Sequence, residues 1–312
     1  LWSHGLGVAE AMDTAQRGMG LDWAATQELI TRSAAEARTV GGRIVAGAGT
    51  DHRGPLDSLD EVTRAYLEQV AFVESSGAGV VLMASRQLAA VATSADDYAL
   101  VYDRLLDQVS RPVVLHWLGE AFDPELAGYW GSADPAKAAD TVLEIIAAHP
   151  AKVDGIKMSV LDARLEADLR GRLPAGVRMY TGDDYHYDEL IRDGSDALLG
   201  AFAAIAPAAS AALRALERRD LAGYDAAIAP TVPLSRHLFA PPTRYYKTGI
   251  AFLSWLSGHQ PGFVMVGGLQ SARSAAHLVR AAELAAAAGV LPDPELAARR
   301  LHLFREVSGY TA

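Results

Sequence analysis

Short apolar runs recur along the chain, and each is followed by a segment with helical spacing. The runs are continuous rather than alternating, which is typical of parallel strands buried on both faces. Repeated alternation of strand and helix predicts βαβ units and a parallel sheet. The seven predicted strands are Gly7–Met12, Arg43–Ala48, Gly79–Ala84, Pro112–Leu118, Val153–Ser159, Val177–Thr181 and Ala197–Phe202.

The segments between these runs carry ordinary helix-start signals. Asp22 and Ser94 stand as N-cap residues, and Ser58 with Glu61 forms a capping-box pattern. The helices predicted between strands are Trp23–Thr39, Leu59–Ser75, Ala95–Val109, Pro135–His149, Asp162–Arg172 and Asp188–Arg192. After the last run the pattern is entirely helical, with predicted helices at Ala208–Arg218, Leu221–Ala229, Leu234–Phe239, Tyr245–Leu256 and Ser271–Ala288.

This pattern predicts an α/β fold, a (β/α)8 TIM barrel with a C-terminal helical extension. A closed barrel needs eight strands, and Leu1–His4 reads as the end of a helix, so we expect a first βα unit upstream. The predicted division is 1–206 for a barrel lacking its first strand and 207–312 for a helical extension packed on it. The alternative is an open doubly wound sheet, whose usual G-x-G-x-x-G turn does not occur here.

The composition narrows the classes of function. Half of the 312 residues are hydrophobic, and cysteine is absent. The lack of cysteine excludes disulfides, thiolate metal sites and a cysteine nucleophile, and it suits the reducing cytoplasm. A formal net charge of −10 argues against nucleic acid or an anionic membrane as partner. The sequence therefore predicts a cytoplasmic protein that acts on a small molecule.

Polar residues gather where the predicted strands end, which is where barrel enzymes carry their chemistry. Lys157 is the most informative of them, because it lies in an apolar run suited to burial. A buried ammonium must be paired or lose its proton, and a desolvated neutral amine attacks carbonyl groups. The alternative interpretation is a structural lysine that pairs with a carboxylate across the barrel.

Several motifs resemble one known family in their order and spacing. The motifs are A-G-A-G-T at 46–50, G-A-G-V-V-L at 77–82, P-V-V-L-H-W at 112–117, G-I-K at 155–157, T-G-D-D at 181–184 and G-S-D-A-L-L-G at 194–200. From about Leu6 to Leu256 the chain resembles the dihydrodipicolinate synthase / N-acetylneuraminate lyase family of class I aldolase barrels, in an uncharacterised dihydrodipicolinate-synthase-like branch. The resemblance implies the barrel, a Schiff base on Lys157 and assembly as a homodimer or homotetramer.

The chain also departs from the family pattern. His116 stands where the family has a proton-relaying tyrosine, and histidine can do that task with a pKa nearer neutrality. The family's carboxylate-binding arginine would fall near Ala121 and is absent, so Arg86 or Arg17 is a candidate replacement, or else a surface residue.

Two further positions bear on the substrate. Asp13, before Thr14, places a carboxylate where the family keeps a neutral hydroxyl, which suits a substrate hydroxyl or cation. Asp183 and Asp184 form a carboxylate pair. We interpret Asp184 as a turn cap, while one of the pair can instead lie beside Lys157 and tune its charge.

The sequence thus predicts a lyase, an aldolase or dehydratase, acting on a small oxo-acid or sugar-derived carbonyl compound. Lys157 is the predicted nucleophile and His116 the acid–base group, with no metal or other cofactor. The predicted substrate-binding residues are Asp13, Thr14, Thr50, Arg86, Ser159 and Asp183. Two alternatives stay open: a non-catalytic sugar-acid binding protein on the same scaffold, and a divalent-metal-dependent barrel enzyme with ligands among Glu10, Asp13, His116, Asp183 and His186.

Overall fold

The strands of the protein form one parallel sheet whose order follows the sequence. The computed structural model describes residues 1–13 and 16–310. Within them seven strands pair consecutively, from first to last. Their bounds are β1 (Val8–Glu10), β2 (Ile44–Ala48), β3 (Gly79–Leu82), β4 (Val113–Leu118), β5 (Val153–Ser159), β6 (Arg178–Thr181) and β7 (Asp196–Ala197).

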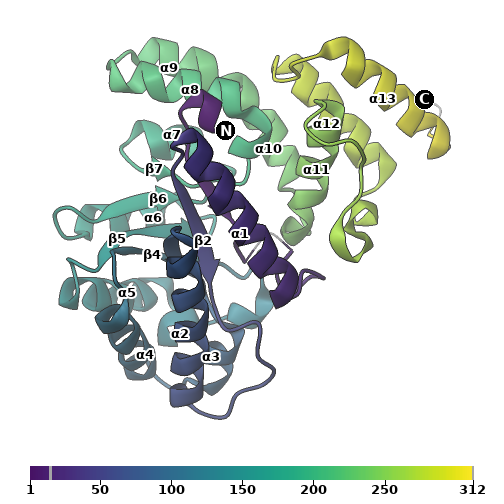
Figure 1. The fold of residues 1–312 in the computed structure, drawn as a ribbon. Coiled ribbons are helices and arrows are strands. Elements are labelled where there is room, and N and C mark those ends of the chain that lie inside the picture. Colours follow the sequence, from purple (N-terminus) through teal and green to yellow (C-terminus); the bar gives the residue numbers. More distant parts are fainter. Residues whose placement is uncertain (14–15, 311–312) are drawn as a thin grey trace.

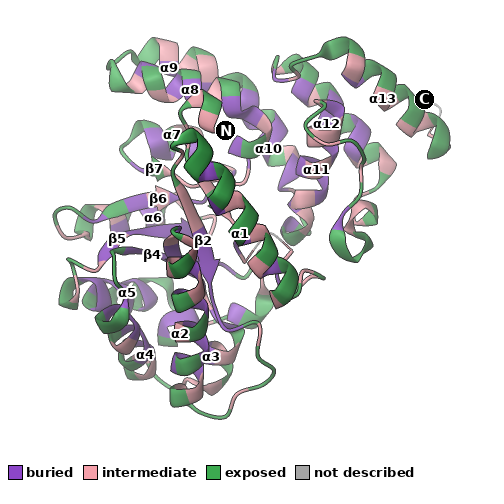
Figure 2. Cartoon of the chain, viewed as in Figure 1, coloured by how far each residue is buried: buried purple, intermediate pink, exposed green. Residues whose placement is uncertain are grey.

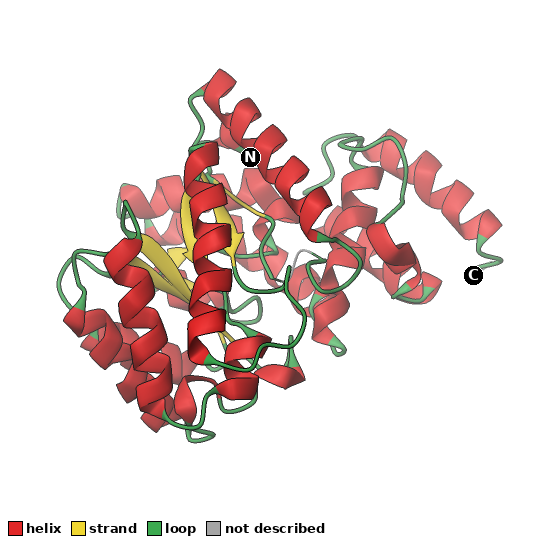
Figure 3. Ribbon diagram, turned by 60° about the horizontal axis from the view of Figure 1, so that its bottom comes forward, coloured by secondary structure: helices red, strands yellow, loops and turns green. Residues whose placement is uncertain are grey.

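The strand order decides the architecture. Parallel βαβ crossovers are right-handed with rare exceptions, so an order without reversal puts the connecting helices on one face of the sheet. The other face can be buried only if the sheet curls, and Figure 3 shows the strands curled inside a layer of helices. The predicted α/β fold is confirmed in this form. The doubly wound alternative needs a reversal of strand order, and the order β1 to β7 has none.

Helices surround the sheet and then continue alone (Figure 1). Those between strands are α1 (Trp23–Val40), α2 (Leu59–Ser76), α3 (Arg86–Val91), α4 (Ala95–Gln108), α5 (Pro135–Ala148), α6 (Ala163–Arg172) and α7 (Tyr187–Arg192). After β7 come α8 (Phe202–Glu217), α9 (Leu221–Ile228), α10 (Val232–Leu238), α11 (Tyr246–Leu256), α12 (Ala275–Ala287) and α13 (Pro294–Val307). The sequence patterns did not predict α3 or α13.

The last predicted strand, Ala197–Phe202, is wrong in extent. β7 ends at Ala197, and the next backbone N–H, of Leu198, still donates to Thr181 O at 3.1 Å. The chain then leaves the sheet, and α8 starts at Phe202. The physical reason is that this apolar run is packed without strand pairing: Leu198 lies against the inner apolar cluster, and Gly200 lies close to Tyr246 and Phe239 of the helical tail.

The apolar side chains form two layers on either side of the sheet. The larger cluster fills the space between strands and helices, and Figure 2 shows the strands buried and the outward faces of the helices exposed. A small cluster of Met12, Val81 and Val114 lies on the inner face, with Tyr180 and Leu198 packed against it. Among the described helices, none is both long and apolar enough to cross a membrane.

Candidate active site

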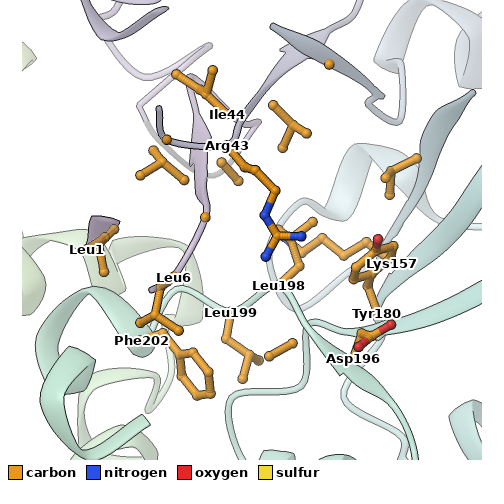
Figure 4. A pocket seen from close by; sticks show the side chains of 18 of the residues that line it. Leu1, Leu6, Arg43, Ile44, Lys157, Tyr180, Asp196, Leu198, Leu199 and Phe202 are labelled. Carbon is orange, nitrogen blue, oxygen red and sulfur yellow. The ribbon is translucent and has the colours of Figure 1, made fainter. Parts of the chain in front are cut away.

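Lys157 lies inside the curled sheet. Successive side chains of a strand point to opposite faces. On β5, Ile156 and Met158 join the outer core, whereas Lys157 lines a cavity of about 1200 Å³ on the inner face. All seven strands contribute residues to the wall of this cavity, and Figure 4 shows Lys157 beside Tyr180 in it. Only 6% of the Lys157 surface is exposed, so its ammonium has lost most of its water.

Burial lowers the pKa of Lys157, and nearby charges modulate it. Desolvation is the largest cause, opposed by the negative charges of Asp13 and Asp184 and assisted by the positive charge of Lys247. These groups come from the β1–α1 loop, the loop after β6 and helix α11. The amine is therefore a buried group whose proton is easier to remove than that of a lysine in water.

Asp184 is, with Asp13, one of two carboxylates whose charge acts on this amine. Burial and the charge of Asp183 raise the pKa of Asp184 to about 7, although Ala201 N–H donates to Asp184 Oδ1 at 2.9 Å and Lys157 acts in the opposite direction. An acid with a pKa near neutrality beside an amine with a lowered pKa can exchange a proton with it under working conditions.

Asp183 has the role of a turn cap. Its carboxylate accepts hydrogen bonds from Tyr185 N at 2.8 Å, His186 N at 3.1 Å and His186 Nδ1 at 2.9 Å. The cap thus lies on Asp183 rather than on Asp184, the reverse of the sequence interpretation. Asp184 is therefore the member of the pair whose charge acts on Lys157. The Asp183 carboxylate instead makes its hydrogen bonds within its own turn.

His116 and Ser159 lie deep against the same face. His116 is fully buried and is the register partner of Lys157 on β4. Its Nε2 lies 3.1 Å from Ser159 Oγ, and its Nδ1 lies 2.7 Å from Asp13 Oδ2. The second contact is an ion pair by distance without the alignment of a hydrogen bond. Burial lowers the pKa of His116, whereas the charge of Asp13 opposes that shift and the charge of Lys157 adds to it.

A glycine leaves room for these groups. A Cβ on Gly182 would lie 2.2 Å from Ser159 Oγ and 2.9 Å from Lys157 Cε. The Gly182 N–H donates to Met158 O at 2.8 Å, which holds the two strands at this spacing. The glycine of the T-G-D-D motif is therefore required by the close approach of the lysine side chain.

Three of the other predicted residues have different partners. Thr50 Oγ1 lies 2.6 Å from Ser85 Oγ and 2.7 Å from Gln87 Oε1. The half-exposed Arg86 pairs with Asp123 at 2.6 Å. The buried Arg17 pairs with Asp51 and donates to Gly47 O at 2.8 Å. The structure therefore does not bring Thr50 or either arginine to Lys157.

The remaining predictions concern Thr14 and a metal site. Thr14 lies outside the described residues. Among residues 1–13 and 16–310, no three His, Asp or Glu side chains gather closely enough to hold a metal ion. Glu10, a suggested ligand, accepts hydrogen bonds from Ala11 N at 2.8 Å and Ser33 Oγ at 3.2 Å.

Sequence reasoning missed Lys247. It stands in the first turn of α11 and lines the same cavity as Lys157. No motif marks it, because it belongs to the helical tail and is distant in sequence from the strand ends.

Solved structures share this fold. A dihydrodipicolinate synthase from Aquifex aeolicus has 13% identity and a TM-score of 0.69, covering 93% of this chain and 89% of that chain. YagE, a prophage protein of the dihydrodipicolinic acid synthase family from E. coli K12, has 15% identity and a TM-score of 0.69, covering 98% and 88%. A Thermotoga maritima dihydrodipicolinate synthase has 16% identity and a TM-score of 0.63, covering 99% and 90%.

At these identities the likeness establishes the fold, and the resemblance that the sequence motifs suggested is confirmed. No curated protein sequence matches the chain. A family model described as "Protein of unknown function (DUF993)" matches residues 1–310. The chain therefore belongs to the DUF993 family, on the fold of the dihydrodipicolinate synthases.

Proposed function

We propose that the protein is a Schiff-base-forming lyase, an aldolase or dehydratase, that acts on a small carbonyl compound. The observation that carries the proposal is the buried amine of Lys157 in an interior cavity beside Asp184, whose pKa is raised to about 7. An amine whose proton is readily removed is the nucleophile that such chemistry needs. The E. coli YagE structure and that of an Acinetobacter baumannii dihydrodipicolinate synthase were solved with pyruvate, which supports a carbonyl ligand for the shared fold.

The first step joins the amine to the substrate. The Lys157 Nζ lone pair attacks the carbonyl carbon, the C=O π electrons move to oxygen, and that oxygen takes the proton of Asp184. Nζ then returns a proton to Asp184. The nitrogen lone pair expels the hydroxyl group, which leaves as water with a proton supplied by Asp184. The product is a protonated imine, an iminium ion, which acts as an electron sink.

His116 supplies the base for the second step. As the carbon–carbon bond of a β-hydroxyl substrate breaks, its electrons flow into the iminium and the hydroxyl group loses a proton. Ser159 Oγ accepts that proton and passes its own to Nε2 of His116, 3.1 Å away. Asp13, 2.7 Å from Nδ1, stabilises the imidazolium that forms. If the same relay abstracts a proton from the α-carbon instead, an enamine forms, and its electrons expel the β-hydroxyl group, which leaves as water with the proton returned from His116 through Ser159; the result is dehydration.

Replacing His116 with glutamine separates the two steps. We expect the His116→Gln variant to form its adduct on Lys157 at close to the wild-type rate, because the first step uses Asp184. Turnover falls by about 10²–10⁴-fold, the usual contribution of an acid–base group. Adduct formation and steady-state turnover are measured on the same preparation. Unchanged turnover would reduce His116 to a packing residue.

Replacing Asp184 with asparagine moves the pH profile of adduct formation. The charges acting on Lys157 are those of Asp13, Asp184 and Lys247, and His116 is a further titratable group near it. The Asp184 carboxylate raises the pKa of Lys157, so the Asp184→Asn variant has a lower Lys157 pKa. We expect the rise of the trapping rate with pH to shift to lower pH. Cyanoborohydride trapping rates from pH 5 to 10 measure this, and a shift to higher pH contradicts the assignment.

Borohydride trapping tests the proposal itself. The chain has four lysines, Lys137, Lys152, Lys157 and Lys247, so peptide mapping can assign an adduct to one of them. The protein is incubated with a panel of keto acids and keto-sugar acids and then reduced. A mass increment on Lys157 is the expected result. Activity that depends on an added divalent cation without any trapped carbonyl compound would favour the metal-dependent alternative. If a sugar acid binds but no adduct is trapped and no activity is detected, a non-catalytic sugar-acid binding protein would be favoured.

We also propose the completed architecture. β1 pairs with β2 and β7 pairs with β6, so each has an edge without a partner among the described strands. Leu6, Leu198 and Phe202 line the cavity where these edges face each other (Figure 4). An eighth parallel strand at this position would close the (β/α)8 barrel of residues 1–206, with 207–312 as its helical extension. By analogy with the fold family we propose a cytoplasmic homo-oligomer, a dimer or a tetramer.

A further inference from the structure

Lys247 reaches the cavity from the helical tail. The start of α11 is fixed against the turn that follows β7, because a Cβ on Gly200 would lie 2.7 Å from the Tyr246 ring and that ring stacks on Phe239 at 4.2 Å. The same turn supplies Ala201 N–H to Asp184. Lys247, one residue after Tyr246, is therefore held on the Asp184 side of the cavity, whose wall it shares with Lys157.

The ammonium of Lys247 has no anionic partner within the described part of the chain. It lies 5.6 Å from the centre of the Tyr246 ring, and no described carboxylate lies within the 4 Å of an ion pair. The residue as a whole is half-buried. A cation in the first turn of a helix also opposes the helix dipole. The positive charge of Lys247 is therefore stabilised neither by the helix dipole nor by an ion pair with a described carboxylate. A bound anion would compensate this charge.

The positive charge of Lys247 changes the pKa values of the two proposed reacting groups, Lys157 and Asp184. It lowers the pKa of Lys157 and acts on Asp184 in the same direction. The two arginines that the sequence offered as carboxylate ligands, Arg86 and Arg17, are already paired with aspartates. Lys247 thus supplies a cation near the amine that those residues do not.

We propose that Lys247 binds the carboxylate of the substrate, which makes the substrate a keto acid rather than a neutral aldehyde or ketone. This inference rests on the proposed Schiff base at Lys157. An ammonium is a compact point charge on a flexible stem, so it fits a carboxylate at more than one distance from the carbonyl. The substrate thereby spans the cavity from Lys157, where its carbonyl reacts, to Lys247, where its charge is compensated.

The test compares acids with their neutral amides. Pyruvate, whose carboxylate adjoins the carbonyl, and levulinate, whose carboxylate lies two methylenes away, are each set against the corresponding amide. For each compound the concentration giving half-maximal borohydride labelling of Lys157 is measured. At a pH above the labelling transition of both proteins, we expect Lys247→Gln to raise this concentration at least about tenfold for the preferred acid and to leave the concentration for the amides unchanged. Lys247→Arg retains most of the acid preference, and Lys137→Gln, at an exposed position, behaves as wild type.

A second readout excludes a merely structural role. Loss of the neighbouring cation raises the pKa of Lys157, so the pH profile of amide labelling shifts to higher pH in Lys247→Gln. If Lys247→Gln raises the half-maximal concentration equally for acids and amides, or changes it for neither, the inference is overturned, while the proposed Schiff base on Lys157 still stands. If no compound labels Lys157 even in the wild-type protein, the proposed function itself fails, and this inference fails with it.

Discussion

The Lys157→Met variant is expected to form no borohydride-stable adduct with any carbonyl compound and to lose at least about 10³-fold in turnover. Methionine matches the length of lysine and keeps an apolar stem in the same space, but it has no amine. Residual turnover would come only from binding and polarisation of the substrate, because the covalent intermediate cannot form. Peptide mapping after reduction and steady-state kinetics measure the two losses independently.

The fold should survive this change. Asp184 loses the cation that lowers its pKa, so its pKa rises further above its ordinary value and the protonated fraction of its carboxyl group at pH 7 increases. A protonated acid is far less costly to bury than a carboxylate. Circular dichroism and thermal melting check the fold, and Lys137→Met, at an exposed lysine, controls for a general effect of removing an amine. Full labelling and turnover in Lys157→Met would refute the proposed nucleophile.

The fold was predictable because parallel strands buried on both faces leave a simple pattern. The runs at Arg43–Ala48 and Val153–Ser159 are mostly apolar and do not alternate regularly with polar residues, and both fall on observed strands. Lys157 stood out for the same reason, as a charged residue within such a run. The pattern failed at Ala197–Phe202, where an apolar run packs on the inner apolar cluster and the helical tail without pairing to a neighbouring strand.

The roles of the site residues depend on distances that a sequence does not contain. Asp183 and Asp184 are adjacent and chemically identical, and only the direction of the chain after β6 decides which of them caps the turn. Arg86 follows a strand end, where a substrate-binding residue is expected. Its guanidinium nevertheless forms an ion pair with Asp123, which lies in a loop distant in sequence. Lys247 reaches the cavity through the packing of the helical tail, which no strand-end pattern could reveal.

The Gly182→Ala variant should lose both stability and adduct formation. The added Cβ would lie 2.2 Å from Ser159 Oγ, 2.9 Å from Lys157 Cε and 2.9 Å from Met158 O. A side chain can rotate away, but the Met158 carbonyl is part of β5 and also accepts the Gly182 N–H. The strands must therefore separate or the Lys157 stem must move. We expect a loss of about 3 kcal/mol in the free energy of unfolding, at the upper end for overpacking, measured by urea denaturation.

Gly171→Ala is the matched control for this change. Gly171 lies in α6 with open space around the position of its Cβ and an ordinary backbone conformation. Alanine there should raise stability by about 0.5–1 kcal/mol through its higher helix propensity and leave adduct formation unchanged. If Gly182→Ala behaved in the same way, Lys157 would not approach the β6 end as closely as the structure places it. The interior position of the amine, on which the proposed chemistry depends, would then be wrong.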